Sequence, residues 1–187
     1  MATISSAKLM SFLRKHQFEF LGSGLYSDVF APAGSDRVIK VCRQCDDWPK
    51  YIFWATKHGY AGLHAPKVHS FRFIEDGRHS FYIASMERLY PLTDDARELR
   101  REVLWNSSKR AAPFHTFIKK LQQEFPQADD LHDGNWLCRK DGALVLTDPL
   151  RASSSSRDDL PTRMRAYDIA MLRNKQFANQ KAYAKRA

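Results

Sequence analysis

Three polar residues in the second half of the chain have the types and spacing needed for phosphoryl transfer. Asp130 and Asn135 lie five positions apart, and Asp148 follows thirteen positions later. In such chemistry one aspartate orients the attacking hydroxyl, while an asparagine and a second aspartate hold the magnesium ions that neutralise phosphate charge. We assign the first role to Asp130 and the second to Asn135 and Asp148. The same spacing also arises by chance in loops rich in Asp, Gly and Asn, so the assignment needs support from elsewhere in the chain.

A glycine-containing hairpin and a lysine strand provide that support upstream. Gly22, Ser23 and Gly24 lie in the turn between two expected strands, where glycine allows a backbone to approach phosphates closely. Val29 follows on the second strand as an apolar cover for a base, and Lys40 lies on a third, alternating strand. The order of glycine hairpin, lysine strand, Asp-x4-Asn and then Asp makes the prediction specific.

With these motifs the chain resembles the protein-kinase-like superfamily. The form Asp-Leu-His-x-Gly-Asn is closer to the aminoglycoside-phosphotransferase-like and RIO-like branches of this superfamily than to the eukaryotic branch. The eukaryotic branch has His-Arg-Asp where this chain has Ala128-Asp129-Asp130. The Leu-Gly-x-Gly hairpin, the Arg-Val-Ile-Lys-Val strand and the His-x-Gly-Asn and Thr-Asp-Pro segments are similar to those of the early serine/threonine protein kinases of short-tailed lytic bacteriophages. The resemblance covers roughly residues 18 to 150.

The resemblance implies an α+β fold, a minimal bilobal protein-kinase-like fold with an antiparallel-sheet N-lobe and a small helical C-lobe. We expect an N-terminal helix in residues 1–17, the N-lobe with its nucleotide-binding sheet in residues 18–89, and the reduced C-lobe in residues 90–187. The resemblance also places Met86 at the gatekeeper position and the backbone of Glu87 and Leu89 against adenine. The alternative for this segment is an ordinary strand end.

The helix equivalent to kinase αC departs from the family pattern. Asp46 and Asp47, followed by a tryptophan and a proline, predict an N-cap and a first turn for a helix that ends near His58. The family carries a glutamate here that pairs with the strand lysine, yet residues 51–58 contain no carboxylate. Lys40 must pair with Asp46 or Asp47, with Asp148, or with the nucleotide alone.

Hydrophobic periodicity and turn residues predict the remaining elements. We expect helices, strands and a small hairpin in the following segments: helices at about 4–16, 93–106 and 113–125, strands at 67–74 and 79–86, and the hairpin over Asp141-Gly142.

The segment after Asp148 combines a serine-rich stretch with a basic tail. Ser153, Ser154, Ser155 and Ser156 form either a solvated loop or an activation-loop-like segment whose phosphates would pair with arginines. A final helix carries Asp168, and the resemblance to the phosphotransferase-like branch implies that this carboxylate braces the catalytic loop. From residue 151 onward nine basic residues stand against three acidic ones. The excess indicates either a solvated face or salt-sensitive, nonspecific attraction to acidic partners, including nucleic acid or RNA polymerase.

Composition narrows the class of protein. The chain has 187 residues and a net charge of +9, which suits one compact domain or two small lobes. An odd number of cysteines, Cys42, Cys45 and Cys138, argues against a secreted disulfide framework, and the Cys-x-x-Cys pair lacks the second pair that a zinc site usually needs. The sequence contains no apolar run of about 20 residues and no signal peptide, so we expect no membrane partner and a cytosolic location, which the resemblance would make the bacterial host cytosol.

We therefore expect a serine/threonine protein kinase that uses ATP and Mg²⁺. The phage resemblance implies that it phosphorylates host proteins of transcription, translation and RNA processing during host takeover. Two alternatives remain open at this stage. One is a catalytically weak pseudokinase that binds and inhibits a host protein such as RNA polymerase, and the other is a small-molecule phosphotransferase of the aminoglycoside type. His132 is expected to order the loop around Asp130 rather than to act as a metal ligand or base.

Overall fold

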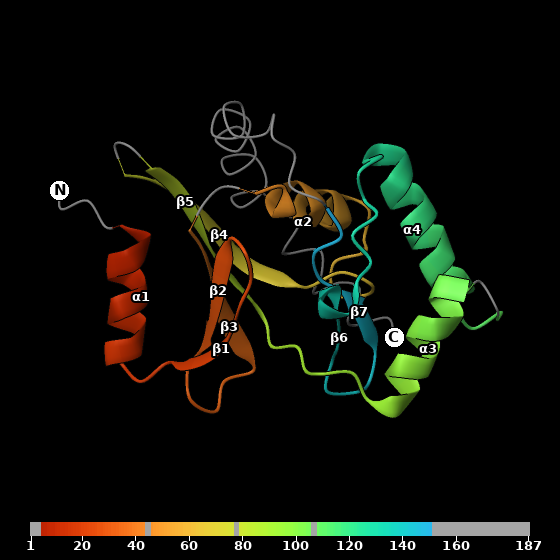
Figure 1. Cartoon of the computed structure of the whole chain (residues 1–187), viewed down its shortest axis with the longest axis horizontal. Helices are drawn as coiled ribbons and strands as arrows, with labels where there is room; N and C mark the ends of the chain where they lie inside the picture. Colours follow the sequence, from red (N-terminus) through yellow and green to blue (C-terminus); the bar gives the residue numbers. More distant parts are fainter. Residues whose placement is uncertain (1–4, 44–45, 77–78, 106–107, 151–187) are drawn as a thin grey trace.

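The computed structural model describes residues 5–43, 46–76, 79–105 and 108–150 of the chain. These residues form an α+β fold with an antiparallel sheet in one lobe and helices with a short hairpin in the other (Figure 1). The expected α+β fold class, with an antiparallel sheet in the N-lobe, is confirmed. In the described part of the chain, no helix is both long and apolar enough to cross a membrane.

The N-lobe is built on one five-stranded antiparallel sheet. Its strands, in the spatial order β1-β2-β3-β5-β4, are β1 (Glu19–Ser23), β2 (Ser27–Ala31), β3 (Arg37–Cys42), β4 (Val68–Asp76) and β5 (His79–Glu87). Consecutive strands are paired as hairpins except at β3, which pairs with β5 because the chain leaves the sheet to form α2 (Trp48–Lys57) before it returns. β3 is therefore central, and its lysine lies in the middle of the sheet.

Alternation along the strands gives the sheet two different faces. Val41 joins Phe30 and Leu13 in a small core beneath α1 (Ser6–Lys15). Lys40 pairs with Val29 across the β2–β3 ladder, and paired residues project to the same face of a sheet. Since successive residues of a strand point to opposite faces, Lys40 and Val29 face away from α1. One face of the sheet is therefore covered by α1, and the opposite face holds the cavity described below.

Helix α2 packs beside the sheet and is almost entirely buried. Trp48 stacks on Tyr82 of β5 with ring centroids 5.7 Å apart, and Phe53 contacts Phe71 of β4 edge to face. Burial of such rings supplies much of the core energy of a domain of this size. The helix is therefore fixed by its packing as well as by the hydrogen bonds described below.

The C-lobe holds the segment with the candidate catalytic residues. It comprises α3 (Asp94–Trp105), α4 (Ala112–Glu124), a 3-10 turn η1 (Asp133–Asn135), β6 (Trp136–Cys138) and β7 (Leu144–Leu146). In Figure 1, α3 and α4 lie at the end of the molecule opposite to α1, and the β6–β7 hairpin lies between them and the sheet. An isolated bridge between Tyr90 and Cys138 joins the segment after β5 to this hairpin.

The structure corrects some local expectations. The N-terminal helix is shorter than predicted and begins after Ser5, whose hydroxyl caps the Lys8 N–H. Asp47 occupies the N-cap position of α2 but makes no side-chain cap, because its backbone is already helical. The carboxylate of Asp46 accepts from the Trp48 N–H instead. The serine stretch 153–156, Asp168 with its helix, the basic tail and Cys45 lie outside the described residues.

Candidate functional site

A cavity of about 600 Å³ lies between the sheet and the β6–β7 hairpin. Its lining includes all nine residues expected to bind nucleotide or metal, but not Asp130: Gly22, Ser23, Gly24, Val29, Lys40, Glu87, Leu89, Asn135 and Asp148. The gatekeeper candidate Met86 lines it as well. Residues separated by more than a hundred positions in the sequence are thus brought to one concave site.

Lys40 is the positive group at the centre of this site. Its Nζ lies 3.5 Å from a carboxylate oxygen of Asp148 and 4.2 Å from the centroid of a Trp48 ring, and its side chain is only 8% exposed. Burial raises the pKa of the Asp46 carboxyl, and the attraction of nearby Lys40 opposes that rise. Of the partners left open by the sequence, Asp148 makes the ion pair, while Asp46 and Trp48 complete the surroundings of the lysine.

Two aromatic side chains connect α2 to the end of β7 and to Thr147, which precedes Asp148. The Trp48 indole Nε1 donates to the Thr147 carbonyl at 3.0 Å, and the Tyr51 hydroxyl donates to the Leu146 carbonyl at 2.7 Å. Tyr51 is fully buried. Helix α2 is therefore connected to the segment that leads to Asp148 through backbone carbonyl oxygens rather than through Lys40.

The backbone around Asn135 holds the two metal-ligand candidates next to each other. The Asn135 carbonyl accepts from both the N–H (2.7 Å) and the hydroxyl (3.0 Å) of Thr147, which directly precedes Asp148. The Asn135 side-chain amide donates to the Asp130 carbonyl at 2.8 Å. This bond turns the Nδ2 group toward the loop of Asp130 and directs Oδ1 away from that carbonyl.

Asp130 lies in a loop that other backbone groups brace. Its N–H donates to the Pro149 carbonyl at 3.2 Å, and its carboxylate lies 3.6 Å from Nε2 of His132. The other imidazole nitrogen, Nδ1, accepts from the Gly134 N–H at 3.0 Å. A Cβ on Gly134 would come within 2.9 Å of the imidazole, so a side chain there would displace the His132 ring. His132 orders the loop around Asp130 through these two contacts.

Side-chain hydrogen bonds from Arg43 and Ser23 stabilise the glycine hairpin. Arg43 donates to the carbonyls of Gly24 (2.7 Å) and Leu25 (3.1 Å), and Ser23 donates to Asp28, a buried carboxylate at the base of the turn. The Gly24 N–H donates to the Ser27 carbonyl, so it faces into the turn. These contacts hold the hairpin over the cavity.

The segment that follows β5 borders the cavity where the resemblance leads us to expect adenine. The Glu87 N–H is not available to a base, because it donates to the Lys67 carbonyl at 2.9 Å. Glu87 uses its side chain for an ion pair with Arg139 of the C-lobe, at 2.8 and 2.9 Å, which links the two lobes. In the described residues the N–H and C=O of Leu89 have no hydrogen-bond partner. Both groups are therefore available to a ligand in the cavity, as the edge of a base requires.

The residues present fit ATP and Mg²⁺ by several local observations. Gly22 and Gly24 have ordinary φ angles, and a Cβ on either would meet no atom closer than 3.8 Å, so neither the backbone nor the packing of the chain demands glycine there. A ligand that approaches the backbone closely would explain why both positions are glycine. One carboxylate and one amide are a typical protein share of a Mg²⁺ shell, which phosphates and water complete. The described residues hold no group of three or more His, Cys, Asp or Glu suited to a metal.

Burial affects the metal-ligand candidate directly. It raises the pKa of Asp148 to about 6, although Lys40 acts to lower that pKa. Nearby Asp46 and Asp130 contribute to the rise because like charges disfavour ionisation. A bound cation would favour the ionised form and reverse the effect.

Sequence reasoning missed several residues that position the site. Trp48, Tyr51, Arg43 and Arg139 make contacts across 18 to 99 positions of sequence. An aromatic residue at a helix start or an arginine after a strand carries no local signal for such a partner. The roles assigned to Asp130, Asn135 and the other site residues remain predictions that biochemical measurement must test.

Comparisons with known proteins give matches to solved structures only. No protein-family model matches the chain, and no curated protein matches it. Sixty chains of solved structures match it. One is described as the structure of the microcompartment-associated aminopropanol kinase, with 12% sequence identity and a TM-score of 0.44, over 76% of this chain and 68% of that one.

Proposed function

We propose that this protein is an ATP- and Mg²⁺-dependent kinase that transfers a phosphoryl group to serine or threonine hydroxyls of proteins. The observation that carries the proposal is the contact of Lys40 with Asp148 at 3.5 Å, inside a cavity covered by a glycine hairpin and bordered by Asn135. A lysine and an acidic metal ligand brought together between two lobes are what a nucleotide triphosphate with its metal requires. The role in phage takeover of host transcription, translation and RNA processing rests on the sequence resemblance alone.

Each residue has a distinct part in the proposed reaction. Lys40 binds the α- and β-phosphates, and Asn135 with Asp148 holds the Mg²⁺ that neutralises charge on the phosphates. Asp130 accepts a hydrogen bond from the substrate hydroxyl and orients its oxygen toward the γ-phosphorus. The new bond joins that oxygen to phosphorus, the bond from phosphorus to the β–γ bridging oxygen breaks, and the hydroxyl proton leaves by way of Asp130 while ADP departs.

The test separates this proposal from the two alternatives. Intact-mass spectrometry would follow this protein and bacterial lysate proteins after incubation with Mg-ATP, using the wild type, Asp130→Asn and a control, Asp129→Asn. The control removes the neighbouring, exposed aspartate of the same loop. We expect mass gains of one phosphate with the wild type and the control, and none with Asp130→Asn, while all three bind Mg-ATP equally.

Other outcomes support the alternatives. Phosphate found on an aminoglycoside or amino alcohol but on no protein would indicate a small-molecule kinase. Mg-ATP binding without any phosphate transfer would leave an inhibitory binding module as the best interpretation.

A further inference from the structure

A second cavity, beside the proposed nucleotide site, is lined by arginines of α3. Its volume is about 490 Å³, and it is bordered by Arg97, Arg100 and Arg101, by Asp133 of the catalytic loop, and by an apolar floor that includes Trp136. It shares Pro91, Gly134 and Leu137 with the nucleotide cavity, so the two are adjoining compartments. Three guanidinium groups against one carboxylate give the lining an excess of positive charge.

The distance to the proposed reacting group is short. Asp133 is three residues from Asp130, so their Cα atoms lie at most about 11 Å apart, because an extended chain spans about 3.6 Å per residue. Asp133 also forms an ion pair with Arg100. An extended peptide whose hydroxyl meets Asp130 would therefore place a residue roughly two to five positions away at the arginines.

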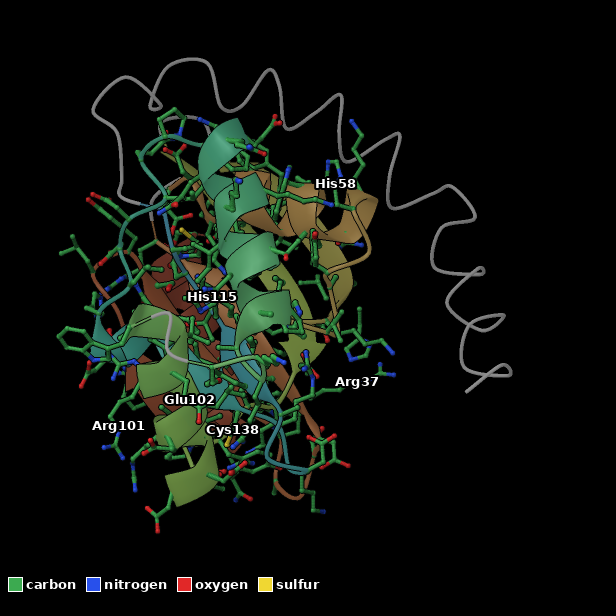
Figure 2. All side chains as sticks on the ribbon, turned by 90° about the vertical axis from the view of Figure 1, so that its right-hand side faces the viewer. Arg37, His58, Arg101, Glu102, His115 and Cys138 are labelled. Atoms are coloured by element: carbon green, nitrogen blue, oxygen red, sulfur yellow. The ribbon has the colours of Figure 1, made fainter. Side chains whose placement is uncertain are left out.

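The arginines are available to a ligand. Arg97 and Arg101 are 59% and 64% exposed, and their partners Asp94 and Glu98 do not line the cavity. Exposed ion pairs of this kind contribute at most about 1 kcal/mol each, so an incoming carboxylate can replace them. Figure 2 shows Arg101 at the periphery of the molecule, beside α3.

Arg100 is the most buried of the three arginines that line this cavity. Its side chain is 16% exposed, and in the described residues its buried Nε has no hydrogen-bond partner. Asp133 therefore does not satisfy the whole guanidinium group.

We propose that this arginine-lined cavity is the subsite for acidic protein substrates, and that it selects segments with a carboxylate two to five residues from the phosphorylated hydroxyl. The inference rests on the proposed kinase activity and adds the substrate class. Arginine suits this task because its planar group binds carboxylates through two hydrogen bonds.

The experiment compares three peptides that differ only near the acceptor serine. The flanking positions two to five residues away carry Glu, Gln or Lys, and kcat/KM is measured at physiological salt. The variant is Arg97→Gln with Arg101→Gln, both exposed positions on a helix that glutamine tolerates. The matched control is Lys8→Gln with Lys15→Gln on α1, which removes the same charge from exposed positions at the opposite end of the molecule.

We expect the Glu peptide to be the best substrate of the wild type and the control. In the arginine variant kcat/KM for the Glu peptide should fall about 3- to 30-fold, the range expected for two exposed charge contacts. The KM for Mg-ATP and the kcat/KM for the Gln peptide should not change. Equal use of the three peptides by the wild type, or an equal loss in the lysine control, would overturn the proposal.

A binding measurement separates this inference from the kinase proposal. Fluorescence anisotropy with a labelled Glu peptide whose acceptor serine is replaced by alanine needs no catalysis. If no peptide is phosphorylated but this binding depends on Arg97 and Arg101, the kinase proposal fails and the acidic-segment site stands. If the Glu peptide binds no better than the Gln peptide, the site fails whatever the activity.

Discussion

Deletion of the Tyr51 hydroxyl should destabilise the protein by about 1–3 kcal/mol. Tyr51→Phe keeps the ring and removes only the donor that meets the Leu146 carbonyl at 2.7 Å. The Leu146 N–H donates to the His64 carbonyl, so the N–H and C=O of Leu146 both point away from β6 and the tyrosine is the natural partner of this carbonyl. A buried acceptor that loses its donor costs about 1–3 kcal/mol. For a chain of this size each kcal/mol lowers Tm by about 2–4 °C, so the expected decrease is about 2–12 °C.

Urea unfolding followed by tryptophan fluorescence measures this change, since Trp48 and Trp136 are both buried. Tyr60→Phe is the matched control, because in the described residues Tyr60 makes ring contacts but no hydroxyl hydrogen bond. We expect the control to stay within about 0.5 kcal/mol of the wild type. A Tyr51→Phe variant as stable as the Tyr60→Phe variant would refute the claim that this hydroxyl holds α2 to β7.

Three further predictions concern the nucleotide and metal site. Mg²⁺-dependent ADP binding, measured by calorimetry from pH 5 to 8, should weaken as the pH falls through about 6, because the raised pKa of Asp148 lets protons compete with the metal at a higher pH than at an ordinary aspartate. Asp46→Asn should move that midpoint to lower pH, since it removes a neighbouring negative charge that raises the pKa of Asp148; an unchanged midpoint would contradict the coupling. Gly22→Ala should leave the unfolding free energy unchanged or raise it slightly, because the added methyl group meets no other atom. It should weaken Mg-ATP binding by roughly tenfold if contact with the phosphates costs about 1.4 kcal/mol of binding free energy. Equal ATP affinity would show that this glycine has no ligand role.

The sheet could be predicted from the sequence because its signals are local. Val29 and Lys40 stand on alternating strands, and turn residues separate those strands, so periodicity alone gives the hairpins and the face on which each side chain lies. The order of the motifs then places the glycine hairpin, the lysine and the acidic loops around one cavity, as the structure has them.

The contacts that fix α2 could not be predicted, because they depend on where distant carbonyl groups lie. Trp48 and Tyr51 read as ordinary core residues of a helix, and both make core contacts. Their polar atoms reach the carbonyls of Thr147 and Leu146, almost a hundred positions later. The N-cap prediction at Asp46-Asp47 is correct in position, but sequence did not reveal which aspartate makes the hydrogen bond. The backbone of Asp47 is already helical, so the carboxylate of Asp46 accepts from the Trp48 N–H instead.

Helix α2 lacks the glutamate that the sequence resemblance leads us to expect, and other contacts hold the site together. In the family pattern one ion pair both orients the strand lysine and fixes the helix, so the two are lost together. Here the tasks are divided: Asp148 and the Trp48 ring contact Lys40, whereas the Trp48 indole and the Tyr51 hydroxyl hold α2 through carbonyl oxygens that carry no titratable charge. Neutralising Lys40 would therefore leave the two hydrogen bonds of α2 intact. The helix is coupled to the segment between the end of β7 and Asp148, so an arrangement without the glutamate still keeps Asp148 and Lys40 in register.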